Sequence, residues 1–296
     1  MKKRIFIFSF FLPLLFFIST GIVRAAEIQA EEMAPDLEMR SVIQSVDVYA
    51  YPGEGSEAKQ IRGKMLSKAR ERIFKGVKKY LDSRTKIAGI NLKYEIIKNR
   101  AGRFVDILKV ENHGADNKGR CHARIQGEVK YRLKGLTYGD DRLRAVLMKH
   151  AAPLTVDVWT DKREYGEGEH VKIFFKGNKG FYGKVVKTGV RGKVFQLLPN
   201  NYRQISFFKG GKIYTIPDEG DRFDLEVHPP FGVERIIVYA SDLPLSLRNM
   251  KTVAKGIYAY RGKESSLGKS VRKSISIPGD GTAEFCESVW KIKKVF

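Results

Sequence analysis

Seven short segments of alternating apolar residues lie between residues 154 and 240, and they constrain the fold more than any other feature. Turn-forming runs such as Gly166-Glu167-Gly168-Glu169 separate the segments. A period of two is typical of half-buried strands, and short strands at close spacing favour a sandwich or a barrel. The sequence therefore predicts an all-β sandwich over residues 154–245. The predicted strands are Leu154–Thr160, Val171–Phe175, Phe181–Lys187, Val194–Leu198, Lys212–Ile216, Arg222–Val227 and Val233–Ala240.

A helical pattern dominates the preceding part of the chain. Residues 56–82 carry apolar side chains at steps of four, and Ser56 is the predicted N-cap. Strands are predicted on both sides of this helix, so a helix packed on one face of an antiparallel sheet, an α+β domain, is expected over 41–138. The apolar positions are Ile61, Met65, Ala69, Ile73, Val77 and Leu81. The predicted strands are Ser41–Tyr51, Leu92–Ile97, Phe104–Glu111 and His122–Leu133.

Two further segments complete this two-domain prediction. Residues 139–153 are a connector with a short helix over Arg142–Lys149, and residues 246–296 are a C-terminal extension. In that extension Leu247–Tyr260 fits helix or strand, and the basic, serine-rich Lys263–Lys273 is predicted to be a loop. Phe285–Phe296 alternates enough for a last strand.

The first residues have the order of a secretory signal peptide. Lys2, Lys3 and Arg4 precede the apolar run Ile5–Ile18, and the small residues Val23 and Ala25 predict cleavage after Ala25. The apolar run is shorter than the ~20 residues of a bilayer span, and a retained anchor is the alternative. The polar, acidic residues 26–40 read as a flexible leader. The sequence thus predicts an exported protein, periplasmic or extracellular.

The formal charge of +22 indicates an anionic partner. For an exported chain this means envelope proteins, or an anionic surface of lipid, glycan or peptidoglycan, and it makes nucleic acid an unfavourable partner. The predicted helix carries a basic stripe that either docks on such a surface or is an ordinary solvated face. Its members are Lys64, Lys68, Arg72, Lys75 and Lys79.

Two cysteines, Cys121 and Cys286, allow one disulfide in an oxidising compartment. The alternative is two separate buried thiols. Sequence separation does not decide between them, because a disulfide requires Cα atoms within about 7 Å.

No catalytic set is visible. Gly262–Ser270 resembles a phosphate loop, but five residues separate its glycines where four are needed. The five histidines lack the H-E-x-x-H spacing of a metal site, and adjacent strand residues such as Cys121 and His122 face opposite ways. There is no Gly-x-Ser-x-Gly elbow. We therefore predict a protein that is not an enzyme, with no cofactor and no metal.

Residues 154–245 resemble the family called domain of unknown function 4384. The resemblance implies a β-sandwich of exported or multidomain bacterial proteins, with no established catalytic residues. Where the family has a small-residue turn after Tyr182, this chain has Gly183-Lys184. The matching residues are Trp159, Asp161, Tyr165, Phe181-Tyr182-Gly183, Phe195-Gln196-Leu197-Leu198-Pro199-Asn200, Lys209-Gly210-Gly211, Ile216-Pro217, Phe231-Gly232-Val233-Glu234 and Ala240-Ser241.

Residues 41–133 resemble the N-terminal domain of the flagellar assembly protein T and related outer-membrane lipoproteins. The matching pieces are Lys68-Ala69-Arg70, Val105–Val110 and Ile125–Val129. Both resemblances imply an envelope module. The expected function is a non-catalytic cell-envelope binding or assembly module, and the alternatives are a cell-wall hydrolase or a charge-driven binder of anionic lipid or glycan.

Overall fold

The computed structural model describes residues 39–52, 57–87, 89–134, 141–247, 249–254 and 257–296. All of them belong to one compact unit, Asp36–Phe296. The predicted signal peptide, its cleavage site after Ala25, the leader before Met39 and the predicted cap Ser56 lie outside the described residues. None of the described helices has the length and apolar content needed to cross a bilayer.

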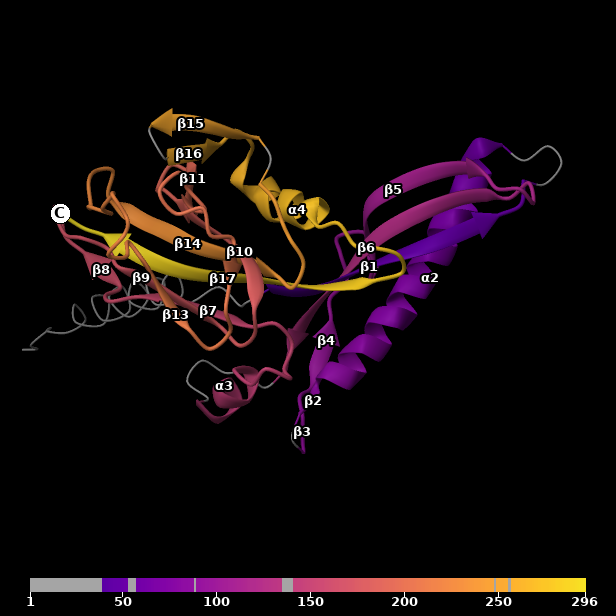
Figure 1. The fold of residues 1–296 in the computed structure, drawn as a ribbon, viewed down its shortest axis with the longest axis horizontal. Coiled ribbons are helices and arrows are strands. Elements are labelled where there is room, and N and C mark those ends of the chain that lie inside the picture. The colour runs from indigo at the N-terminus through magenta and orange to yellow at the C-terminus, as the bar shows by residue number, and fades with distance from the viewer. Residues whose placement is uncertain (1–38, 53–56, 88, 135–140, 248, 255–256) are drawn as a thin grey trace, which may run out of the picture. The chain divides into compact units, whose positions relative to one another are not determined.

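Helix α2 (Ala58–Arg84) covers one face of the antiparallel strands β1 (Met39–Ala50), β6 (Cys121–Leu133) and β5 (Asp106–Ala115) (Figure 1). The predicted apolar stripe is the buried face of the helix, since Met65, Ala69, Ile73, Val77 and Leu81 pack against the apolar side of the sheet. The helix ends at Thr85, whose amide and hydroxyl both donate to the carbonyl of Leu81. The predicted helix on an antiparallel sheet is confirmed. Three short strands follow: β2 (Lys86–Ile87), β3 (Ile90–Asn91) and β4 (Tyr94–Ile96).

The predicted sandwich is also present. A three-stranded sheet in the order β13-β9-β7 shares one hydrophobic core with strands of the larger sheet. Phe175 from the small sheet and Val185 and Val238 from the large one are all buried in it. The predicted segment Arg222–Val227 contributes only an isolated bridge between Glu226 and His170. The strands are β7 (Val156–Thr160), β8 (Glu164–Tyr165), β9 (Ile173–Gly177), β10 (Phe181–Thr188), β11 (Val194–Leu198), β12 (Phe207–Phe208), β13 (Ile213–Ile216) and β14 (Gly232–Ser241).

Strand β17 (Thr282–Lys294) joins the two halves into one sheet. It pairs with β14 over Phe285–Lys294 and with β1 over Thr282–Glu287, as Figure 1 shows in yellow. The strand order β10-β14-β17-β1-β6 runs without a break across the connector, which contains α3 (Asp141–Leu147). The predicted boundary at 139–153 therefore separates two hydrophobic cores but not two sheets. The predicted C-terminal extension supplies a central strand.

The structure corrects the loop predicted over Lys263–Lys273, which is helix α4 (Glu264–Ser274). Leu267 and Val271, four residues apart, are buried in a third hydrophobic core. The open choice at Leu247–Tyr260 is resolved in favour of strand: β15 (Met250–Ala254) pairs with β16 (Ile257–Tyr260).

No disulfide joins Cys121 to Cys286. Cys286 pairs with Arg40 at one end of β1, and Cys121 pairs with Ala50 at the other end. Ten strand residues at about 3.3 Å each separate the two positions by roughly 33 Å, far more than a disulfide spans. Of the two alternatives that the sequence left open, the structure therefore has two separate thiols, because the two cysteines pair with opposite ends of one strand.

Candidate functional site

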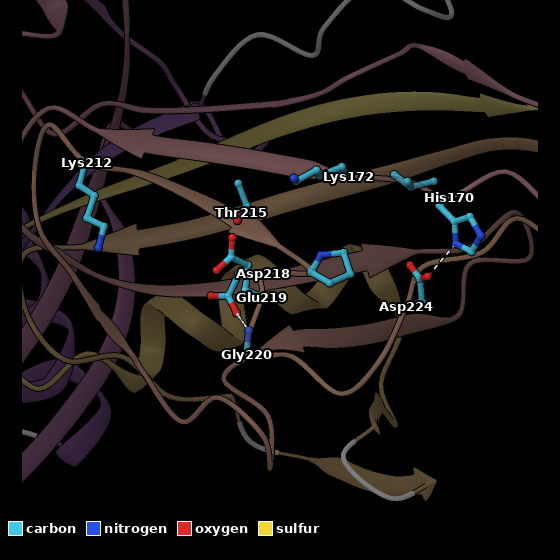
Figure 2. Close-up of a pocket in the computed structure, with 10 residues that line it drawn as sticks. His170, Lys172, Lys212, Thr215, Asp218, Glu219, Gly220 and Asp224 are labelled. Atoms are coloured by element: carbon cyan, nitrogen blue, oxygen red, sulfur yellow. Dashed lines mark hydrogen bonds and ion pairs between the residues drawn. The ribbon is translucent and has the colours of Figure 1, made fainter.

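A hollow with a volume of about 890 Å³ lies beside the small sheet of the sandwich. The residues that lead into β9, strand β13 and the loop from Pro217 to Asp224 border it. Figure 2 shows Lys212 at one end, His170 at the other and Thr215 between them. The lining residues are His170, Val171, Lys172, Lys212, Thr215, Pro217, Asp218, Glu219, Gly220 and Asp224.

Positively and negatively charged side chains both line this hollow. His170 Nδ1 lies 2.8 Å from Asp224 Oδ2, an exposed pair drawn as a dashed line in Figure 2. The ammonium groups of Lys172 and Lys212 lie 5.9 and 5.2 Å from the ring centres of neighbouring aromatic residues, within cation–π range. The hollow therefore offers cationic and carboxylate groups to one ligand.

The loop that walls the hollow is held by hydrogen bonds. Arg203 pairs with Asp218, lies 3.5 Å from Asp221 Oδ2 and donates to the carbonyl of Thr215 at 2.8 Å. Asp218 Oδ1 accepts the amide of Gly220 at 3.0 Å. This network gives the hollow a fixed wall, as expected of a preformed binding site.

Thr215 carries the one hydroxyl side chain among the lining residues of this hollow. His170 and Asp224 resemble a base with its orienting carboxylate, but neither serine nor cysteine is among the lining residues. The arrangement is suited to holding a polar ligand by its charges.

The predicted basic stripe lies on the exposed side of α2, but three of its five cations have partners in the same chain. Lys68 Nζ donates to the carbonyl of Tyr49 at 3.4 Å, and Lys75 pairs with Glu71 at 2.7 Å. Arg72 binds the carbonyl of Asp47 and the carboxylate of Asp280. Lys68 and Arg72 thus bind carbonyl groups of β1 beyond the residues that pair with β17, and these contacts reduce the charge available for docking.

The structure also gathers three residues that sequence reasoning did not connect, Asp47, His113 and His122. They lie on β1, β5 and β6, on the sheet face opposite α2. His122 Nε2 is 2.8 Å from Asp47 Oδ1, and the rings of His122 and His113 are stacked at 4.7 Å. The guanidinium of Arg124, hydrogen-bonded at 3.0 Å to Asp47 Oδ2, lowers the pKa of Asp47.

The prediction of no metal site rested on local spacing, which cannot detect side chains that three separate strands bring together. The available signal was alternation along β6. Alternation places the side chain of His122 on the sheet face opposite the core-packed Cys121, as predicted. Which residues of β1 and β5 lie beside His122 follows only from the register of the strand pairs.

Comparison with known proteins finds a match for one stretch of the chain, residues 164–244. Neither the curated proteins nor the solved structures contain a match. The resemblance of residues 41–133 to the flagellar assembly protein T finds no support. All ten residues that line the hollow fall within the one matched stretch: residues 164–244 match the family described as Domain of unknown function (DUF4384).

Proposed function

We propose that this protein is a non-catalytic binding module of the bacterial cell envelope, and that the hollow beside β9 and β13 holds its ligand. The observation that carries the proposal is the lining of that hollow. Lys172 and Lys212 face the same space as Asp218, Glu219 and Asp224, without a serine or cysteine nucleophile.

A ligand with charges of both signs fits this lining best. Peptidoglycan carries carboxylates and amines on one polymer, so it complements the hollow more fully than a purely anionic lipid surface. The net charge of +22 and the signal-peptide pattern of the first residues favour an exported protein that meets this polymer.

Cosedimentation with purified peptidoglycan sacculi tests the proposal. Reversing Lys172 and Lys212 to glutamate should lower affinity for sacculi about tenfold or more, because two cations of the hollow become repulsive. The matched control reverses Lys64 and Lys79, two exposed stripe residues that make no ion pair with a described residue. The control should bind like the wild type.

Two outcomes would contradict the proposal. Equal losses in both variants, together with binding that disappears as salt shortens the Debye length from ~10 to ~3 Å, would indicate charge-driven binding alone. Release of soluble wall fragments by the protein would indicate a hydrolase.

A further inference from the structure

Three side chains from three strands converge on the sheet face opposite α2. The carboxylate of Asp47 and ring nitrogens of His113 and His122 all lie within 4.8 Å of one another. We propose that these three residues bind one divalent transition-metal ion of the zinc class.

The strand register explains the convergence. His122 on β6 pairs with Tyr49 on β1, so Asp47 lies one same-face position away. On the other side, β5 is irregular between Asn112 and Gly114, and Gly114 has φ +80°. A bulge of this kind re-aims the inserted side chain, here His113, so that its ring stacks on His122.

Neighbouring groups hold two of the ligands in position. The His122 ring stacks on Tyr49, with ring centres 4.5 Å apart and an angle of 10° between the planes. Asp47 Oδ2 accepts from Arg124 at 3.0 Å, which leaves Oδ1 on the side of the histidines. Outer groups that orient ligands in this way are the usual surroundings of a metal site.

The donor set selects the class of ion. Two imidazole nitrogens and one carboxylate oxygen suit Zn²⁺ and its neighbours, whereas Mg²⁺ and Ca²⁺ prefer oxygen ligands. Binding replaces the hydrogen bond between His122 and Asp47 by one metal bond from each side chain. The proton on Nε2 leaves to solvent, and a neutral imidazole takes one up at Nδ1, so that a net proton is released only from an imidazolium ring.

The site is open to incoming ions, because the side chains of Asp47 and His122 are each 22% exposed and His113 is exposed. Three protein ligands leave a fourth tetrahedral position for water or for a group of a partner. The cations of Arg120 and Arg124 oppose binding of a cation here. Glu111, which lies across the strands from Arg124, forms its ion pair with Lys109 and so offsets little of their charge.

Titration of the metal-free protein with Zn²⁺ against a chromophoric chelator tests the proposal. We expect one ion per chain, and at least a tenfold loss of affinity in His113→Ala and in His122→Ala. The matched control is His170→Ala. It removes a different exposed histidine–aspartate pair, which has the same 2.8 Å separation but no third ligand among the described residues, and should leave the affinity for Zn²⁺ unchanged.

A second readout guards against variants that fail to fold. Zn²⁺ should raise the midpoint of thermal unfolding of the wild type and of His170→Ala, but not of His113→Ala, because an ion stabilises only the state that binds it. His113 is exposed, so its replacement should preserve the fold, which circular dichroism would verify. Equal affinity in the wild type and His113→Ala would overturn the proposal.

Discussion

At Gly210 the backbone passes too close to its neighbour for any side chain to fit. A Cβ there would lie 2.5 Å from the Cα of Lys179. The next residue, Gly211, has φ +77° and donates its amide to the carbonyl of Gly177 at 2.8 Å. Glycine is therefore required at the two positions for different reasons: at Gly210 two backbone segments lie too close for a Cβ, and at Gly211 the backbone is left-handed.

Replacing Gly210 by alanine should lower the free energy of unfolding by about 1–3 kcal/mol, because the added methyl group meets backbone atoms that cannot move independently. Gly63 is the matched control. It lies within α2 with no atom within 4 Å of its would-be Cβ, so Gly63→Ala should stabilise by about 0.5–1 kcal/mol. Urea unfolding measures both, and a destabilised Gly63→Ala or a neutral Gly210→Ala would contradict this account.

Asp242 supplies a pH-dependent contribution to stability. Burial, and then the nearby carboxylate of Glu284, raise the pKa of Asp242 to about 6 against the opposing charge of Lys179. Lys179 itself pairs with Glu284 at 2.8 Å, and Arg84 at the end of α2 also interacts with Asp242. The folded state therefore binds a proton at Asp242 that the unfolded state has released.

Since the pKa of Asp242 is raised on folding, its contribution to stability decreases as pH rises from about 4 to about 6, then stays constant. Asp242→Asn keeps an oxygen that can accept the amide of Glu284 but cannot ionise. The variant should gain stability relative to the wild type across this window, a difference measured by urea unfolding at pH 4, 5, 6 and 7. A difference that does not vary with pH would disprove the assignment.

Helix α4 is held in place by buried ion pairs as well as by its apolar residues. Arg272 Nε lies 2.8 Å from Glu128 on β6, and its Nη1 lies 3.3 Å from Glu287 on β17. Because arginine is charged, the buried Arg272 is not counted among the apolar positions from which a helix is predicted. With only Leu267 and Val271 on its apolar side, the helix therefore has the sequence pattern of a basic loop.

Arg272→Ala should cost about 3–5 kcal/mol, because Glu128 is left as an unpaired buried charge. The neighbouring Lys273 is exposed, and Lys273→Ala should stay within about 0.5 kcal/mol of the wild type. Adding Glu128→Gln to Arg272→Ala should recover part of the loss. If Arg272→Ala and Lys273→Ala unfold at the same urea concentration, the ion pairs of Arg272 do not stabilise the helix.

Elements whose own residues decide their structure were predictable. The apolar stripe from Met65 to Leu81 predicted α2. The alternation of apolar and polar residues predicted most strands of the sandwich, including β11 with its observed ends. Pairing between distant strands was not predictable, because register depends on three-dimensional contacts. The juxtaposition of Asp47 with His122 and the distance between the two cysteines both follow from the pairing of β1 with β6 and β17.

At the scale of the whole molecule, the shared sheet should make unfolding a single event. Beyond the β17 pairings, Asn178 Nδ2 donates to the carbonyls of Leu147 and Pro153 in the connector, and the buried Arg40 donates to Thr155. Scanning calorimetry should therefore show one transition, with calorimetric and van't Hoff enthalpies in agreement. A fragment of residues 154–296 should be less stable than the full chain, because the edge of β17 at Thr282–Glu287 loses its partner. Two separated transitions would contradict this.

The late position of β17 in the sequence also determines how long β1 lacks one of its two strand partners during synthesis. Met39–Gln44 must wait for strand partners about 240 residues later in the chain, although β6 can pair with the other edge of β1 much sooner. At ~5–20 residues per second, a ribosome needs roughly 12–50 s to make the intervening segment. During that interval the nascent polypeptide presents an unfilled strand position, to which a chaperone can bind before the sheet is complete.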